Sequence, residues 1–207
     1  MLKAVREYLS FAGVQYLNPD KAGDEREKML TLRKKGQEAR KSFTELAKTF
    51  QASHPEWQLQ QTSQWMNQAQ RLRPHLWVYL QREGKVTEPM MALRLYGTPA
   101  DFGISLEVSF IERKKDEQTL DKQAKVLELP VVEGIYYLVY SDGQSQRWEA
   151  NEENRQILRN KLSNQEVRKV LVKIDVPITE NSSEEEIVEA LLKSYDKILP
   201  FYLATRN

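Results

Sequence analysis

The stretch MMALRLYGTPADFGISLEVSFI, residues 90–111, decides the fold. It holds two apolar segments, 90–96 and 104–111, separated by a Gly-Thr-Pro stop. In the second segment every other residue from Ile104 to Phe110 is apolar, which is the two-residue period of a strand with one buried face. The stretch therefore predicts two neighbouring strands of a sheet.

Further strands are expected on both sides of this stretch. Asp142-Gly143 is a hairpin signal that joins two of them. Several links between the apolar segments are short turns, and short turns favour antiparallel pairing. We therefore expect a mostly antiparallel central sheet of about five to six strands. The additional segments are 76–80, 135–140, 146–149 and 167–174.

Two helices are expected before the sheet, over residues 2–17 and 22–53. The second has an apolar stripe at alternating spacings of three and four residues, which is typical of a helix packed along another helix. We expect the two to form a helical hairpin within one molecule. The alternative is a homodimer through the 22–53 helix. The stripe consists of Met29, Leu32, Ala39, Phe43, Leu46 and Phe50, with Gly36 at the remaining seam position.

Three more helices are expected later in the chain, over residues 117–128, 152–162 and 184–199. The last begins with a serine cap, Ser183, followed by three glutamates, which is a good helix start. We expect it to stop before Pro200.

The fold class is therefore α+β, with the sheet framed by the N-terminal helical hairpin and the C-terminal helix. Residues 1–56 are expected to form the helical hairpin region and residues 57–207 the α+β domain, within one compact unit. The chain of 207 residues contains 40% hydrophobic and 29% charged residues, as expected of a globular protein with a core.

Composition excludes several kinds of site. The chain has no cysteine and two histidines, which excludes disulfides, thiol nucleophiles and histidine-rich metal sites. Its formal net charge is +1, so no overall charge points to nucleic acid or acidic lipid. No apolar run approaches the roughly 20 residues of a membrane span, so we expect no membrane partner and a cytoplasmic location.

Aromatic rings, amides and cations alternate between residues 65 and 79. Such a set can stack a base, read its edge and hold phosphates, whether in DNA or in RNA. The alternative is that the aromatic residues simply pack the sheet and that the amides form a turn. The candidate nucleic-acid-binding residues are Trp65, Asn67, Gln68, Arg71, Arg73, His75, Trp77 and Tyr79.

A second constellation consists of Asp101, Glu112 and Lys114. An acid about ten residues before an E-x-K, at the end of an apolar strand, resembles the core of the PD-(D/E)xK nucleases. In such a site two carboxylates hold a divalent metal such as Mg²⁺, and the lysine activates water. The alternative is a charged turn, residues 112–117, where the strand leaves the core.

Four aromatic residues lie on the predicted hairpin strands 135–140 and 146–149. Aromatic side chains on paired strands stabilise a sheet through cross-strand contacts, and we expect this structural role. The alternative is that they line a pocket. The residues are Tyr136, Tyr137, Tyr140 and Trp148.

The order of elements resembles the N-terminal DNA-binding domain of McrB-type, modification-dependent restriction systems. A helical region precedes a tryptophan-containing segment and the strand residues Leu76-Trp77-Val78-Tyr79, and Ser183 opens a terminal helix near the end. The likeness covers residues 57–203. It implies a module that binds DNA and flips a modified cytosine into a pocket at residues 75–79, without being the nuclease itself.

Three functions are therefore considered. The first is a non-catalytic nucleic-acid-binding module that recognises modified or flipped bases. The second is a metal-dependent nuclease, and the third is a protein-interaction or scaffold domain acting through the 22–53 helix.

Overall fold

The computed structural model describes residues 2–206, so Met1 and Asn207, the ends of the two predicted regions, lie outside the described residues. Seven strands form a single sheet in the order β1-β2-β3-β4-β7-β5-β6, and all neighbouring pairs are antiparallel. The strands are β1 (Gln58–Leu59), β2 (Trp77–Gln81), β3 (Met90–Thr98), β4 (Asp101–Ser109), β5 (Ile135–Ser141), β6 (Gln144–Glu149) and β7 (Lys169–Ile178).

Helices alternate with these strands and confirm the α+β class. The described part of the chain contains α1 (Leu2–Leu9), α2 (Arg26–Ala52), α3 (Thr119–Ala124), α4 (Glu152–Ser163) and α5 (Glu184–Ala204). Short 3₁₀ turns span Pro19–Lys21, Gly23–Glu25 and Lys125–Leu127. The predicted strand count was too low, because the sheet also includes β1, a two-residue strand without an apolar pattern of its own.

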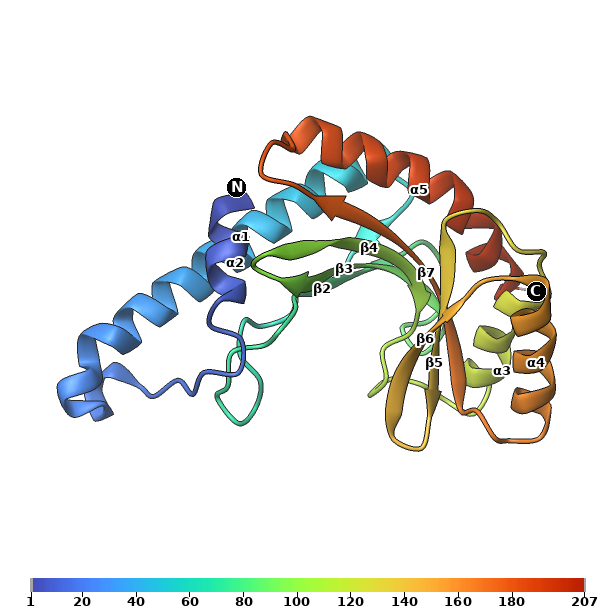
Figure 1. The fold of residues 1–207 in the computed structure, drawn as a ribbon, viewed down its shortest axis with the longest axis horizontal. Coiled ribbons are helices and arrows are strands. Elements are labelled where there is room, and N and C mark those ends of the chain that lie inside the picture. The colour runs from blue at the N-terminus through green and yellow to red at the C-terminus, as the bar shows by residue number, and fades with distance from the viewer. Residues whose placement is uncertain (1, 207) are drawn as a thin grey trace.

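The sheet is bent into an arch, with α2 and α5 along its outer side and α3 and α4 beside its β5–β7 end (Figure 1). We call the helix-covered side the outer face and the concave side the inner face. Alternation along each strand sends apolar side chains such as Val78, Leu106 and Val172 into the core under the helices. The intervening side chains, which are mostly polar or aromatic, therefore belong to the inner face.

Helix α2 buries the predicted stripe, with Phe43, Leu46 and Phe50 only 1%, 1% and 0% exposed. Part of this surface packs against α1, which crosses α2 near its middle, and part packs against α5 (Figure 1). The predicted homodimer through the 22–53 helix is therefore not supported, because the seam is already occupied within one molecule.

Two predicted helix ends were wrong. Helix α1 stops at Leu9 instead of residue 17, because the chain turns at Gly13, whose φ of +82° suits glycine, and then bridges from Gln15 to Arg71. Helix α5 continues through Pro200 to Ala204. The side chains after that proline pack into the core and offset the hydrogen bond that it removes.

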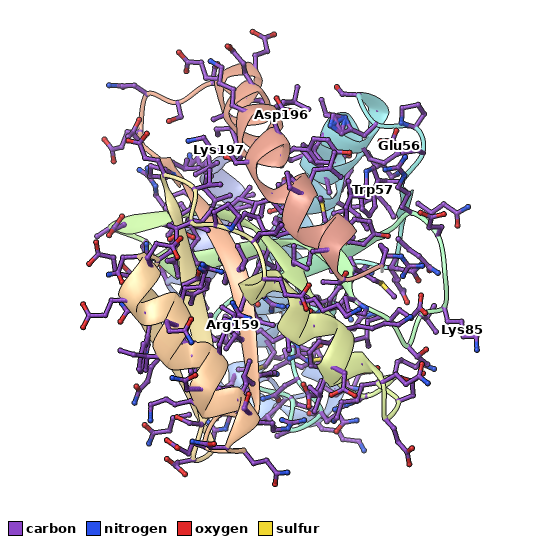
Figure 2. All side chains as sticks on the ribbon, turned by 90° about the vertical axis from the view of Figure 1, so that its right-hand side faces the viewer. Glu56, Trp57, Lys85, Arg159, Asp196 and Lys197 are labelled. Atoms are coloured by element: carbon purple, nitrogen blue, oxygen red, sulfur yellow. The ribbon has the colours of Figure 1, made fainter. Side chains whose placement is uncertain are left out.

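The outer side also holds the segment between α2 and the sheet in place. The Trp57 indole donates a hydrogen bond to the Tyr195 hydroxyl at 3.0 Å, and this hydroxyl donates to Glu56 at 3.2 Å. Figure 2 shows Glu56 and Trp57 beside α5 on this side of the molecule. Within residues 2–206, none of the helices combines the length and apolarity that crossing a bilayer requires.

Helix α2 and the 65–72 loop touch at Gly36. A Cβ atom at this position would lie 2.5 Å from the Trp65 ring. Gly36→Ala should therefore lower the free energy of unfolding by about 1–3 kcal/mol, although glycine-to-alanine changes within helices usually stabilise. Urea unfolding measures this, with Lys34→Ala on the exposed side as a control that changes stability by less than about 0.5 kcal/mol. A more stable Gly36→Ala protein would contradict the close packing.

Candidate nucleic-acid interface

The inner face is built by strand alternation and by register. Trp77 of β2 lies opposite Arg94 of β3, and Glu107 of β4 lies opposite Lys173 of β7, which in turn lies opposite Tyr136 of β5. Rows of polar and aromatic side chains therefore cross the sheet at right angles to the strands. The inner-face side chains include Trp77, Tyr79, Arg94, Ser105, Glu107, Lys173, Asp175, Tyr136, Tyr140 and Arg147.

A buried ion triad occupies the centre of this face. Arg94 donates from Nε and Nη2 to Glu107 Oε1 at 3.0 and 2.8 Å, and Lys173 Nζ lies 2.9 Å from Glu107 Oε2. The Glu107 side chain is 0% exposed. Burial opposes its ionisation, but the charges of Arg94 and Lys173 outweigh this and lower the pKa of Glu107 to about 2. The triad is therefore ionised at neutral pH and ties three strands together.

Cations lie over aromatic rings on both sides of the triad. The guanidinium groups of Arg73 and Arg94 lie 4.8 and 5.2 Å from the centre of the Trp77 ring. On β5 the Tyr136 ring lies 3.6 Å from the Arg147 guanidinium, and both residues hydrogen-bond to Asp175. Such contacts hold the rings and the cations in fixed positions.

Next to the triad lies a cavity of about 390 Å³, within the usual range of ligand sites. His75 lines this cavity and is neutral at pH 7. Burial, aided by the charge of Arg94, lowers the pKa of its imidazole to about 4. Lys169 lies 5.2 and 5.0 Å from the Phe110 and Tyr140 rings. The cavity is lined by His75, Tyr79, Arg94, Ser109, Phe110, Glu112, Leu138, Tyr140, Ser145, Lys169 and Leu171.

Two arginines beside the cavity have no acidic partner. Among the described residues, no carboxylate forms an ion pair with Arg73 or Arg113. Partial burial lowers the pKa of Arg73, and the nearby charge of Arg113 acts in the same direction. Guanidinium groups without an acidic partner favour an anion from outside.

The predicted 65–79 segment divides into two parts. Its first part is a loop on the helices, in which Trp65 is 6% exposed and Asn67 Oδ1 accepts from the Arg71 amide. Arg71 donates to the Gly13 carbonyl, and Gln68 is exposed at the turn. The second part points its alternate residues to the inner face. The structure therefore brings the side chains of Arg73, His75, Trp77 and Tyr79 to the inner face, whereas the side chains of Trp65, Asn67, Gln68 and Arg71 belong to the loop.

Other residues of the site lie on strands distant in sequence. Arg94, Glu107 and Lys173 had no place in the predicted site, although charged residues within an otherwise apolar strand, such as Lys173 and Asp175 in VLVKIDV, are a signal of that kind. The four aromatic residues predicted on the hairpin strands do not share one environment. Tyr140 lines the cavity and Tyr136 lies on the inner face, whereas Tyr137 is buried in the core.

The predicted metal site is not supported by the geometry. Asp101 and Ser109 are the two ends of β4, so Asp101 and Glu112 are separated by the whole strand, roughly 27 Å at ~3.4 Å per residue. Glu112 is instead bound by Lys115, Arg168 and Lys169. Lys114 is exposed in the following turn. Residues 2–206 contain no group of three or more acidic, histidine or cysteine residues that could hold a metal ion.

The triad makes a prediction about stability. Glu107→Gln leaves the Arg94 and Lys173 charges buried without a counter-charge, and should lower the free energy of unfolding by about 3–5 kcal/mol. Glu112→Gln is the matched control: its side chain is 42% exposed, and the loss should be about 1 kcal/mol or less. Chemical denaturation measures both, and equal losses would mean that the triad is not the stronger contact.

His75 makes a prediction about pH. Its imidazole takes up a proton near pH 6.5 when unfolded but only near pH 4 when folded, so stability is full above pH 6.5 and falls as pH is lowered toward 4. Between pH 7 and 5 the loss should be about 2 kcal/mol. In His75→Gln this part of the pH dependence should vanish. An unchanged pH profile in the variant would show that His75 is not held neutral.

The inner face thus combines a cavity, aromatic rings and guanidinium groups without acidic partners. These features come from six strands, β2 to β7, and from the segment before β2. No protein-family model matches the chain, and no curated protein matches it, so its function is inferred from these side chains.

Proposed function

We propose that the protein is a non-catalytic nucleic-acid-binding module whose inner face takes an unpaired or flipped base into the cavity. The observation that carries this proposal is the cavity itself, which has aromatic and apolar walls and lies next to two arginines without acidic partners. A relationship to the DNA-binding domain of McrB-type systems and a cytoplasmic location are parts of the same proposal.

The walls of the cavity suit a flat ring. Phe110, Tyr140, Leu138 and Leu171 supply aromatic and apolar surface. Stacking of a base on an aromatic side chain contributes ~1–3 kcal/mol per base and requires the base to be out of the duplex. The neutral His75 imidazole and the Ser109 hydroxyl supply polar groups that can hydrogen-bond to a base edge.

Arg73 and Arg113 suit the phosphates on either side of such a base. Guanidinium groups bind phosphate through paired hydrogen bonds, and these two carry charge that no carboxylate of the described chain neutralises through an ion pair. They follow the cavity residue Glu112 or precede the cavity residue His75 in the chain, and they supply positive charge that the net charge of +1 does not indicate.

We propose a non-catalytic module because the acidic side chains of the inner face are paired with cations. Glu107 and Glu112 are each bound by at least two cations, and Asp175 is bound by Arg147 and by the Tyr136 hydroxyl. Carboxylates held in this way are poor general bases. The scaffold alternative has less support, since the α2 seam is buried.

Fluorescence anisotropy with labelled single-stranded DNA, duplex DNA and single-stranded RNA tests the proposal. Affinity for single strands should exceed that for the duplex and should fall steeply between 50 and 200 mM salt. Arg73→Gln and Arg113→Gln should each weaken binding several-fold and reduce the slope of log K against log salt by about 0.7. Arg33→Gln, on the exposed side of α2, is the matched control and should bind as the parent does.

Two results would contradict the proposal. One is the absence of binding to every strand at 50 mM salt, where phosphate contacts are strongest. The other is binding that Arg33→Gln weakens as much as Arg73→Gln does, since the contact surface would then not be the inner face.

A further inference from the structure

Arg94 uses only part of its guanidinium group within the protein. Of the five N–H donors of an arginine, those of Nε and one of Nη2 are directed to Glu107 Oε1. The guanidinium also hydrogen-bonds to the Tyr79 hydroxyl, which leaves the remaining donors without a partner among residues 2–206. The Arg94 side chain is 21% exposed while Glu107 is 0% exposed, and Arg94 lines the cavity. The edge of the guanidinium whose donors Glu107 and Tyr79 leave free is therefore the part open to a ligand.

This free edge is held in a fixed direction. Glu107 forms an ion pair with the other edge, Lys173 forms an ion pair with Glu107, and the Trp77 ring lies 5.2 Å from the guanidinium carbon. Arg94, Lys173 and Glu107 together carry a net charge of +1. The cavity therefore presents two parallel donors and an excess positive charge before any ligand enters. Because the arginine is already ordered, little side-chain entropy is lost when a ligand binds.

Two parallel donors select a ligand with two adjacent acceptors. Guanine has such a pair on one edge, O6 and N7, and a bidentate arginine contact to them is the commonest base-specific contact in protein–DNA complexes. An unpaired cytosine has another pair, O2 and N3, but its opposite edge carries no N–H donor. Adenine places an amino group beside N7, which would oppose an arginine donor. The opposite edge of guanine carries N–H donors, and the Glu112 carboxylate and the neutral His75 imidazole in the same cavity can accept from them.

We infer that the cavity is selective for guanine, whose O6 and N7 accept from the free edge of Arg94. The inference rests on the proposed function, in which the inner face binds a nucleic-acid strand. Two oxygens of a phosphate are another pair of acceptors, so the test must distinguish binding of a base from binding of the phosphate backbone.

The test varies the ligand and keeps the protein unchanged. The probes are oligothymidylates with one central residue replaced by guanine, adenine, cytosine, hypoxanthine, 7-deazaguanine or an abasic site, and the affinity of the full chain for each is measured by anisotropy. The guanine probe should bind about 10-fold tighter than the adenine probe. Hypoxanthine keeps O6 and N7 and should retain most of this gain, whereas 7-deazaguanine lacks N7 and should lose most of it.

Arg94→Lys supplies the test on the protein side. Lysine keeps the charge that faces Glu107 but has no paired donors, so the guanine and adenine probes should bind the variant equally. Circular dichroism shows whether the variant is folded, and the 7-deazaguanine probe decides the question if it is not.

The outcomes separate the two proposals. Equal binding of the guanine and 7-deazaguanine probes overturns the inference and leaves the proposed function standing, as does equal or tighter binding of the abasic probe, which would assign Arg94 to phosphate. Failure of every probe to bind at low salt overturns the proposed function itself.

Discussion

The fully buried carboxylate of Glu107 is the constraint on which the inner face depends. It lies on β4 and bonds to Arg94 of β3 and Lys173 of β7, so it joins the N-terminal strands to the strand that comes last in the chain. A buried triad of this kind contributes less to net stability than its Coulomb energy suggests, because three charges must leave water. Its contribution here is to fix the orientation of the Arg94 guanidinium. Arg94 cannot turn toward solvent without leaving Glu107 Oε1 buried and unpaired.

The two faces of the sheet follow from this arrangement. On the outer face, apolar side chains pack under α2, α3 and α5 and supply the hydrophobic stabilisation. The inner face is polar and aromatic yet largely buried by its own curvature, so its charges are satisfied by one another and by ring contacts. A concave face of this composition, with two arginines left without acidic partners at its side, is suited to a ligand that is flat in one part and anionic in another.

Local elements could be predicted from the sequence, and their partners in space could not. Alternation from Ile104 to Phe110 and the stripe from Met29 to Phe50 are local signals, and both describe the structure well. The site depends on register between distant strands. Nothing near Glu107 in sequence indicates Lys173, sixty-six residues later, as its neighbour. For the same reason the 65–79 segment was treated as one surface, although only its residues from Arg73 onward follow the strand that faces the cavity.

The central place of β7 has a consequence for the order in which the molecule can assemble. This strand is the seventh along the chain, yet it lies between β4 and β5 and pairs with both. Until residues 169–178 are in place, the β2–β4 meander and the β5–β6 hairpin have no edge in common. Contacts of such long sequence separation form slowly. The cavity takes walls from both halves, so its wall is complete only once β7 lies between them.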